Sequence, residues 1–165
     1  QGKLVMGLNI NETAEDSRFI SAVYNAILGG GANSKLFQNV REKASLAYTT
    51  GSNYNRTKNC IFIRAGIEIQ NYQKALDTIK QQLENMKNGN FTDKDIKDSK
   101  ELIIASIEGI SEEQDTEITY YYGQELANRF VDLKEYMDKI KAVTKDQIVK
   151  LAQNININTI YFLKD

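Results

Sequence analysis

The feature that most restricts the fold is a run of alternating apolar residues near the middle of the chain. From Ile61 to Ile69 every second residue is isoleucine or alanine, and Phe62 and Glu68 are among the residues in between. A period of two is typical of a β-strand with one face in a core. The other face of this strand is mixed in character, so we expect it to face a cavity or a partner.

Other patterns surround this strand with further strands and a series of helices. Period-two or Thr- and Tyr-rich segments predict strands at 4–10, 47–55 and 157–163, and residues 55–59 read as a hairpin turn. Helical spacing predicts helices that begin after Thr13, after Asn33 or Ser34, after Asn71 and after Thr92, and two more at 113–129 and 133–142. Three capping boxes are predicted, Thr92 with Asp95, Ser111 with Gln114, and Thr144 with Gln147. Strands and helices do not alternate regularly, so we predict an α+β fold. Its sheet would be small and mostly antiparallel or mixed, with helices on one face.

Length and composition indicate an ordinary globular chain. The 165 residues suit one domain, residues 1–165, and the formal net charge of −1 provides no basic field for nucleic acid or membrane. No apolar run has transmembrane length. A single cysteine fits a reducing compartment, so we expect a cytoplasmic protein.

The residue types present exclude several catalytic devices. The chain has no histidine and one cysteine, Cys60. A histidine-based catalytic triad and a His-Glu-x-x-His zinc site are therefore excluded within this chain. The acidic run at 112–117 is the remaining metal candidate. Acidic residues at a helix start are favoured by the helix dipole alone, so we predict no metal site here.

Arg41 and Tyr48 are the candidate functional side chains. Arginine offers a permanent charge with a planar fork of donors, and tyrosine offers one hydroxyl on a rigid arm. A short helix-to-strand connection would bring both to one edge of the sheet, where they could clamp a peptide carbonyl or stabilise an oxyanion. On spacing alone, a surface ion pair for Arg41 and simple packing for Tyr48 are the favoured interpretation.

A triple glycine, Gly29, Gly30 and Gly31, is the second candidate. The residues that follow are Ala-Asn-Ser-Lys, so the Gly-Lys-Ser/Thr order of a phosphate loop is absent. A helix start after glycines can still hold an anion or a peptide carbonyl, and a plain helix stop is the alternative.

The stretch LGGGANSKLFQNVREKASLAYTTGS, residues 28–52, resembles the C-terminal, zinc-lacking domain of insulinase/pitrilysin-family zinc peptidases, which include the processing peptidases. That family pattern is an aliphatic residue with glycines, then Ser-x-Leu-Phe, Arg-Glu-Lys and Leu-Ala-Tyr, and the residues here follow in matching order. A second stretch, GIEIQNYQKALDTIKQQLENMKNGNFTDKDI, is similar to the segment that follows in bacterial members. The order of elements matches across nearly the whole chain.

The resemblance implies a role inside a larger peptidase. In the family, two such domains form one half of the enzyme and two halves enclose a chamber, so a dimer is expected. Zinc lies in an N-terminal domain, in the same parent or in a paired subunit. The opposite half supplies an arginine and a tyrosine that correspond to Arg41 and Tyr48. They would hold a peptide carbonyl while zinc-bound water in the partner domain attacks. No activity is expected from this domain alone.

The resemblance also implies that Gly29, Gly30 and Gly31 correspond to a longer glycine-rich loop that handles substrate. A weaker expectation is that the sheet edge at 61–69 pairs with an extended peptide. Two other functions fit the chain. It could be part of a catalytically inactive subunit that acts as a scaffold, or a small-molecule domain that uses the glycines as an anion site.

Overall fold

A computed structural model describes residues 1–14, 16–126 and 128–164. Four strands form one sheet in the order β2-β3-β1-β4, and every neighbouring pair is antiparallel. The strands are β1 (Gly2–Ile10), β2 (Ala47–Asn55), β3 (Cys60–Ile67) and β4 (Ile155–Leu163).

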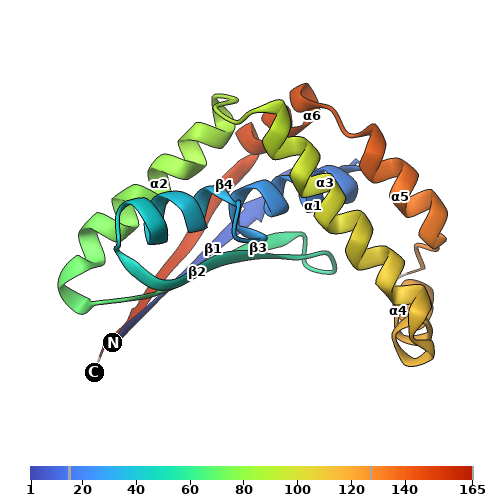
Figure 1. The fold of residues 1–165 in the computed structure, drawn as a ribbon, viewed down its shortest axis with the longest axis horizontal. Coiled ribbons are helices and arrows are strands. Elements are labelled where there is room, and N and C mark those ends of the chain that lie inside the picture. Colours follow the sequence, from blue (N-terminus) through green and yellow to red (C-terminus); the bar gives the residue numbers. More distant parts are fainter. Residues whose placement is uncertain (15, 127, 165) are drawn as a thin grey trace.

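The helices lie against one face of this sheet (Figure 1). They are α1 (Ser17–Gly29), α2 (Tyr72–Lys87), α3 (Asp93–Glu108), α4 (Gln114–Leu126), α5 (Leu133–Ala142) and α6 (Lys145–Gln153). A π-helix, η1 (Phe37–Lys43), and two 3-10 turns, η2 (Ile69–Asn71) and η3 (Gly109–Glu112), complete the order. Helix α4 projects beyond the end of the sheet (Figure 1). The predicted α+β class, with a small antiparallel sheet and helices on one face, is confirmed.

The core follows from the alternation in β1 and β3. Leu4 lies opposite Ala65 and Met6 lies opposite Ile63, and all four side chains are buried beneath the helices. Because the strand period is two, the residues between them face away from the helices. The predicted mixed face is therefore the face of the sheet that the described helices leave uncovered.

Two of the three predicted capping boxes are present. Thr92 caps α3 and Thr144 caps α6, each with the reciprocal side-chain bond from the third helical residue. The box predicted at Ser111 is wrong, because α4 begins at Gln114 itself. The Ser111 hydroxyl instead donates to the Glu108 carbonyl at 2.8 Å, within the turn that ends α3.

Several predicted boundaries are also wrong. The helix predicted at 113–129 is α4, which ends at Leu126, and the strand predicted at 157–163 is β4, which begins at Ile155. Helix α1 begins at Ser17 rather than directly after Thr13, because the Glu12 carboxylate accepts the backbone N–H groups of Thr13 and the next residue at 3.0 Å and holds them in a turn. Strand β3 ends at Ile67, and Ile69 belongs to a 3-10 turn.

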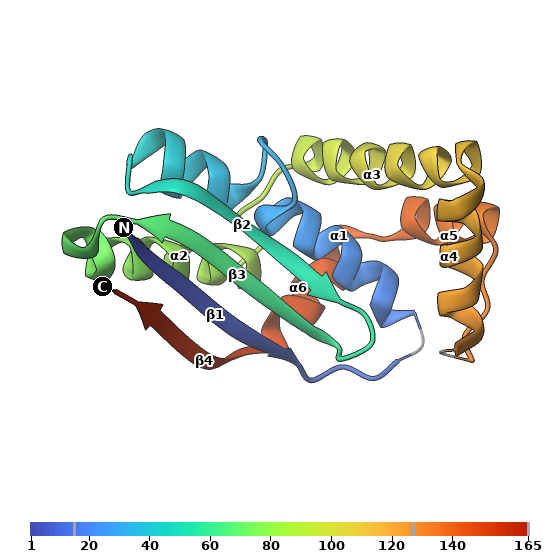
Figure 2. The same cartoon turned by 90° about the horizontal axis from the view of Figure 1, so that it is seen from below.

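The expectation that the 61–69 strand offers an edge to a peptide is wrong as well. Strand β3 pairs with β2 on one side and with β1 on the other, so its backbone groups are already used (Figure 2). The edges of the sheet are β2 and β4.

Candidate functional site

The candidate site forms where η1 turns into β2. Ser45 adopts a φ of 50°, and the Leu46 N–H donates to the Val40 carbonyl at 2.9 Å. This left-handed residue and the wide π-helical turn reverse the chain within a few residues, so that β2 begins at Ala47. Because Val40 and Ala47 are buried, they fix the corner on the core. π-Helical turns of this kind occur frequently at functional sites.

This corner brings Arg41 and Tyr48 into one open pocket. The pocket has a volume of about 490 Å³, and Glu68 and Asn71 line its other side. It lies at the end of the sheet where β2 starts, the same end at which β1 begins (Figure 2). The predicted proximity of the two side chains is therefore present in the fold.

Tyr48 is exposed but held in a defined orientation. Its side chain is 54% exposed, and its hydroxyl donates to Glu68 Oε1 at 2.8 Å. Gln70 Nε2 donates to the other carboxylate oxygen of Glu68 at 2.8 Å. The hydrogen bond to Glu68 raises the pKa of Tyr48, and the same bond lowers the pKa of Glu68. The phenol is thus protonated at neutral pH and able to donate.

Arg41 is held by stacking rather than by a strong ion pair. Its guanidinium carbon lies 4.7 Å from the centroid of the Phe37 ring, one helical turn earlier. Its Nε lies 3.7 Å from Glu42 Oε1, and both side chains are substantially exposed. An exposed pair at that distance contributes little, so the guanidinium is free to exchange this contact for a ligand.

The glycines lie in a different place. A Cβ on Gly29 would lie 2.4 Å from the backbone nitrogen of Ser52, and one on Gly30 would lie 2.7 Å from the Ala26 Cα. Close packing therefore requires these two glycines. A Cβ on Gly31 would make only an ordinary contact with the Leu102 side chain, and Gly31 borders a second pocket of about 520 Å³ beside α3, which shares no lining residue with the Arg41–Tyr48 pocket. The structure does not bring the glycines to the Arg41–Tyr48 pair.

Glu68 is the site residue that sequence reasoning did not single out. Its position on the mixed face of the 61–69 segment was the available signal. Ala47 pairs with Ile67 where β2 starts and β3 ends, and the register shifts between Ala47 and Thr49, so that Tyr48 has no partner in the ladder. Its side chain instead reaches Glu68, the residue that follows β3.

The acidic run at 112–117 spans η3 and the first turn of α4. Within residues 1–14, 16–126 and 128–164, no group of three or more metal-ligating Cys, Asp or Glu side chains converges. None of the helices in the described ranges combines the length and the apolarity needed to cross a bilayer.

The sheet and its helical layer form an α+β domain whose fold occurs in other bacterial proteins of known structure. A conserved protein from Enterococcus faecalis V583 superposes with a TM-score of 0.92 at 30% identity, over 99% of this chain and 39% of that chain. A peptidase M16 inactive domain from Pseudomonas fluorescens superposes with a TM-score of 0.78 over 94% of this chain and 40% of that chain, and at 19% identity it supports the fold alone.

A family model described as the peptidase M16 inactive domain matches residues 1–103. The chain belongs to this family. It is 36% identical to YmfF of Bacillus subtilis (strain 168), described as a probable inactive metalloprotease, over 99% of this chain. It is 27% identical to YmxG of the same organism, described as an uncharacterized zinc protease, over 94% of this chain. The chain spans 39% of the length of each of these two relatives.

Proposed function

We propose that this chain is the zinc-lacking domain of a larger M16 peptidase and that it presents Arg41 and Tyr48 to the peptide substrate of a partner domain. The observation that carries the proposal is the shared pocket: two hydrogen-bond donors of different shape line it, and both are substantially exposed. Neither side chain is buried in a way that would explain its position by packing.

The two side chains would act on a peptide carbonyl. The guanidinium of Arg41 offers a planar fork of donors and is oriented by Phe37, while Tyr48 stays protonated and would turn from Glu68 to the carbonyl. Donors fixed in this way stabilise developing negative charge on a carbonyl oxygen. A zinc-bearing N-terminal domain, in the same parent or in a paired subunit, would supply the metal chemistry.

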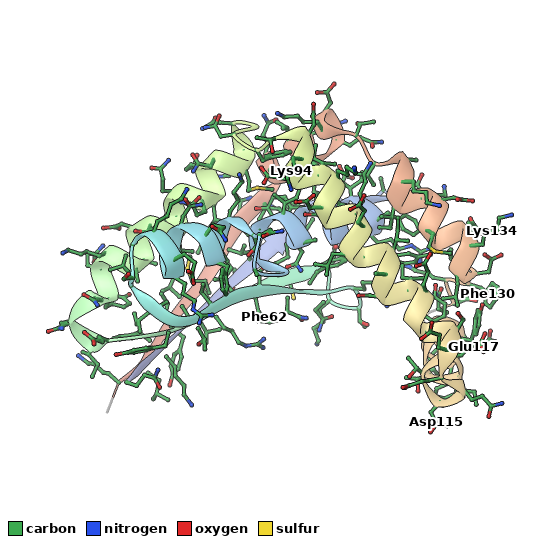
Figure 3. All side chains as sticks on the ribbon, viewed as in Figure 1. Phe62, Lys94, Asp115, Glu117, Phe130 and Lys134 are labelled. Carbon is green, nitrogen blue, oxygen red and sulfur yellow. The ribbon has the colours of Figure 1, made fainter. Side chains whose placement is uncertain are left out.

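The uncovered face of the sheet would form part of the chamber wall. Figure 3 shows Phe62 projecting from the sheet on the side away from the helices. The Arg64 guanidinium lies 5.7 Å from the Phe62 ring, so the face offers both an apolar and a cationic contact. Such a surface supports the binding of an extended peptide beside the Arg41–Tyr48 pocket.

Turnover in the assembled enzyme tests the proposal. The variants Arg41→Ala and Tyr48→Phe would be made in the full-length parent, assembled with its zinc-bearing half, and kcat and KM measured on a fluorogenic peptide. Each variant should lower kcat/KM roughly 100-fold, the loss typical of a removed oxyanion donor. Lys43→Ala on the same helical segment is the matched control, since Lys43 is exposed and lies outside the pocket.

A scaffold role in an inactive subunit is the second candidate. It is favoured by the 36% identical relative that is described as a probable inactive metalloprotease. It also fits the contacts that Arg41 and Tyr48 make with Glu42 and Glu68 of their own chain. The same assay separates the two functions, because a scaffold predicts unchanged turnover in both variants. Loss of turnover in either pocket variant, with wild-type thermal stability and an active control, would exclude it.

A further inference from the structure

Unpartnered polar atoms gather on one side of α1, away from the Arg41–Tyr48 pocket. In the described part of the chain four buried side-chain polar atoms have no hydrogen-bond partner, and three of them belong to Arg18, Ser21 and Asn25. These positions lie on one face of the helix because they are three and four residues apart. Buried polar groups are almost always satisfied by protein, water or a ligand, so a row of unsatisfied ones indicates a missing partner.

Two guanidinium groups, those of Arg18 and Arg56, lie close enough to Tyr136 to influence its pKa. Arg18 Nη1 donates to the carbonyl of Arg129 at 3.4 Å, and the Arg56 guanidinium carbon lies 5.7 Å from the Tyr136 ring centroid. No carboxylate among the described residues lies within 4.0 Å of either of these two guanidinium groups. Neither arginine therefore has a carboxylate in direct contact among those residues.

The tyrosines of this region respond to that charge. Burial raises the pKa of Tyr136, and Arg56 and Arg18 oppose the shift. Burial also raises the pKa of Tyr54, and the adjacent Ser21 hydroxyl and Arg56 oppose it. The Ser21 hydroxyl nevertheless lies outside hydrogen-bonding geometry, and Tyr54 donates instead to Asn59 Oδ1 at 3.2 Å.

A pocket of about 340 Å³ is lined by Asn25 and Arg56, whereas Arg18 and Ser21 lie outside its lining. Its polar side carries Arg56, Asn25 and Asn53, which come from the hairpin tip, α1 and β2. Its other side is apolar and is formed by side chains of α1 and α3, namely Ala22, Ala26, Leu102 and Ile103. Helix α1 packs against both β2 and α3, and Figure 2 shows it between them. A ligand that fills this pocket needs an anionic end and an apolar end.

We propose that this pocket binds an oxyanion joined to an aliphatic group, specifically the terminal carboxylate of a peptide that ends in an aliphatic residue. Arg56 pairs with the carboxylate through its planar fork, a geometry that guanidinium and carboxylate share. The amide of Asn25 rotates so that its buried oxygen accepts a peptide N–H. The aliphatic side chain packs between α1 and α3, against Leu102 and Ile103.

The test is a ligand-observed NMR titration of the full-length parent protein with N-acetyl-L-leucine. Its neutral analogue, N-acetyl-L-leucinamide, keeps the aliphatic group and lacks the charge. Inorganic phosphate keeps an oxyanion and lacks the aliphatic group. Saturable binding of N-acetyl-L-leucine is expected, with affinity at least roughly tenfold higher than that of either analogue, because a charge-assisted hydrogen bond and an apolar contact are both needed.

Single substitutions test whether N-acetyl-L-leucine binds in this pocket. Arg56→Ala should weaken N-acetyl-L-leucine roughly tenfold or more, and Arg56→Lys should weaken it less, because the charge remains and the fork is lost. Lys58→Ala is the matched control on the same exposed hairpin tip. Arg41→Ala should leave the affinity unchanged, which separates this site from the proposed peptidase site. Absence of saturable binding, equal binding of the amide or of phosphate, or an affinity that Arg56→Ala leaves unchanged would overturn the proposal.

Discussion

At the scale of single residues, the contact between Tyr48 and Glu68 determines how the candidate site behaves. One hydrogen bond of 2.8 Å orients the phenol and shifts the pKa of both partners in opposite directions. Both side chains are exposed, so the bond acts mainly on orientation and protonation rather than on stability.

Glu68→Gln tests this coupling. Removal of the carboxylate charge should lower the pKa of Tyr48 toward its ordinary value of 10.0, because the bond to Glu68 is the largest cause of the rise. NMR titration of ring-labelled tyrosine measures the shift, with Tyr48→Phe to assign the signal. Glu42→Gln, a second exposed carboxylate of the same pocket, should leave it unchanged. An identical Tyr48 pKa in wild type and Glu68→Gln would contradict the coupling.

The hydrogen bond between Tyr48 and Glu68 also predicts how the unfolding free energy changes with pH. The pKa of Glu68 lies below its ordinary value of 4.5 in the folded chain, chiefly because Tyr48 donates to it. A carboxylate with a lowered folded-state pKa stabilises the fold above 4.5 and loses that contribution as the pH falls through the lowered pKa. Tyr48→Phe should remove this part of the acid dependence of the unfolding free energy. An acid limb that keeps its wild-type slope in Tyr48→Phe would contradict the assignment.

The sequence predicted Arg41 and Tyr48 as neighbours but did not identify Glu68 as the partner of Tyr48. Arg41 and Tyr48 are seven positions apart across one turn, so local chain geometry already brings them together. Glu68 reaches Tyr48 from twenty residues away through the register of β2 and β3. Register depends on long-range strand pairing, which a single alternating pattern does not specify.

At the scale of elements, the end of α1 packs so closely against β2 that position 29 must be glycine. Gly29→Ala should lower the unfolding free energy by about 1–3 kcal/mol, because its Cβ would meet a backbone atom that has no room to move. Gly31→Ala is the matched control, since its nearest neighbour is the flexible end of Leu102 at 3.4 Å. Chemical denaturation measures both. Equal stability of the two variants would contradict the packing explanation.

The elements that depend on local signals were predicted well. The alternation of β3 and the caps of α3 and α6 follow from neighbouring residues, and the structure has them. The Ser111 box failed because the chain continues from α3 through a 3-10 turn before α4 begins. The pattern of residue types alone does not show that a 3-10 turn, rather than the start of a helix, forms at this position.

At the scale of the whole molecule, an apolar row on α4 remains exposed. Ile118, Tyr122 and Leu126 are 66%, 63% and 70% exposed, and Phe130 is 63% exposed. The first three share one side of α4 because they are four residues apart. A contiguous apolar surface of this kind indicates a protein contact. This row supports the proposed assembly with the rest of a larger peptidase.

Leu126→Asp tests that contact. The substitution should change the unfolding free energy of this chain by less than about 0.5 kcal/mol, because the side chain is already exposed. It should weaken association between the two halves of the parent, measured by analytical ultracentrifugation. Thr116→Asp, an exposed residue on a different side of α4, is the control. Unchanged association in Leu126→Asp would remove α4 from the interface.

The central claim is that Arg41 and Tyr48 reach the substrate of a partner domain. A crystal structure of the full assembly with a bound, uncleaved peptide tests it most directly. We expect the Arg41 guanidinium and the Tyr48 hydroxyl both to lie within about 3 Å of one peptide carbonyl oxygen, and the hydrogen bond from Tyr48 to Glu68 to be broken. A peptide bound beside the zinc while Tyr48 still donates to Glu68 and Arg41 faces bulk solvent would contradict it.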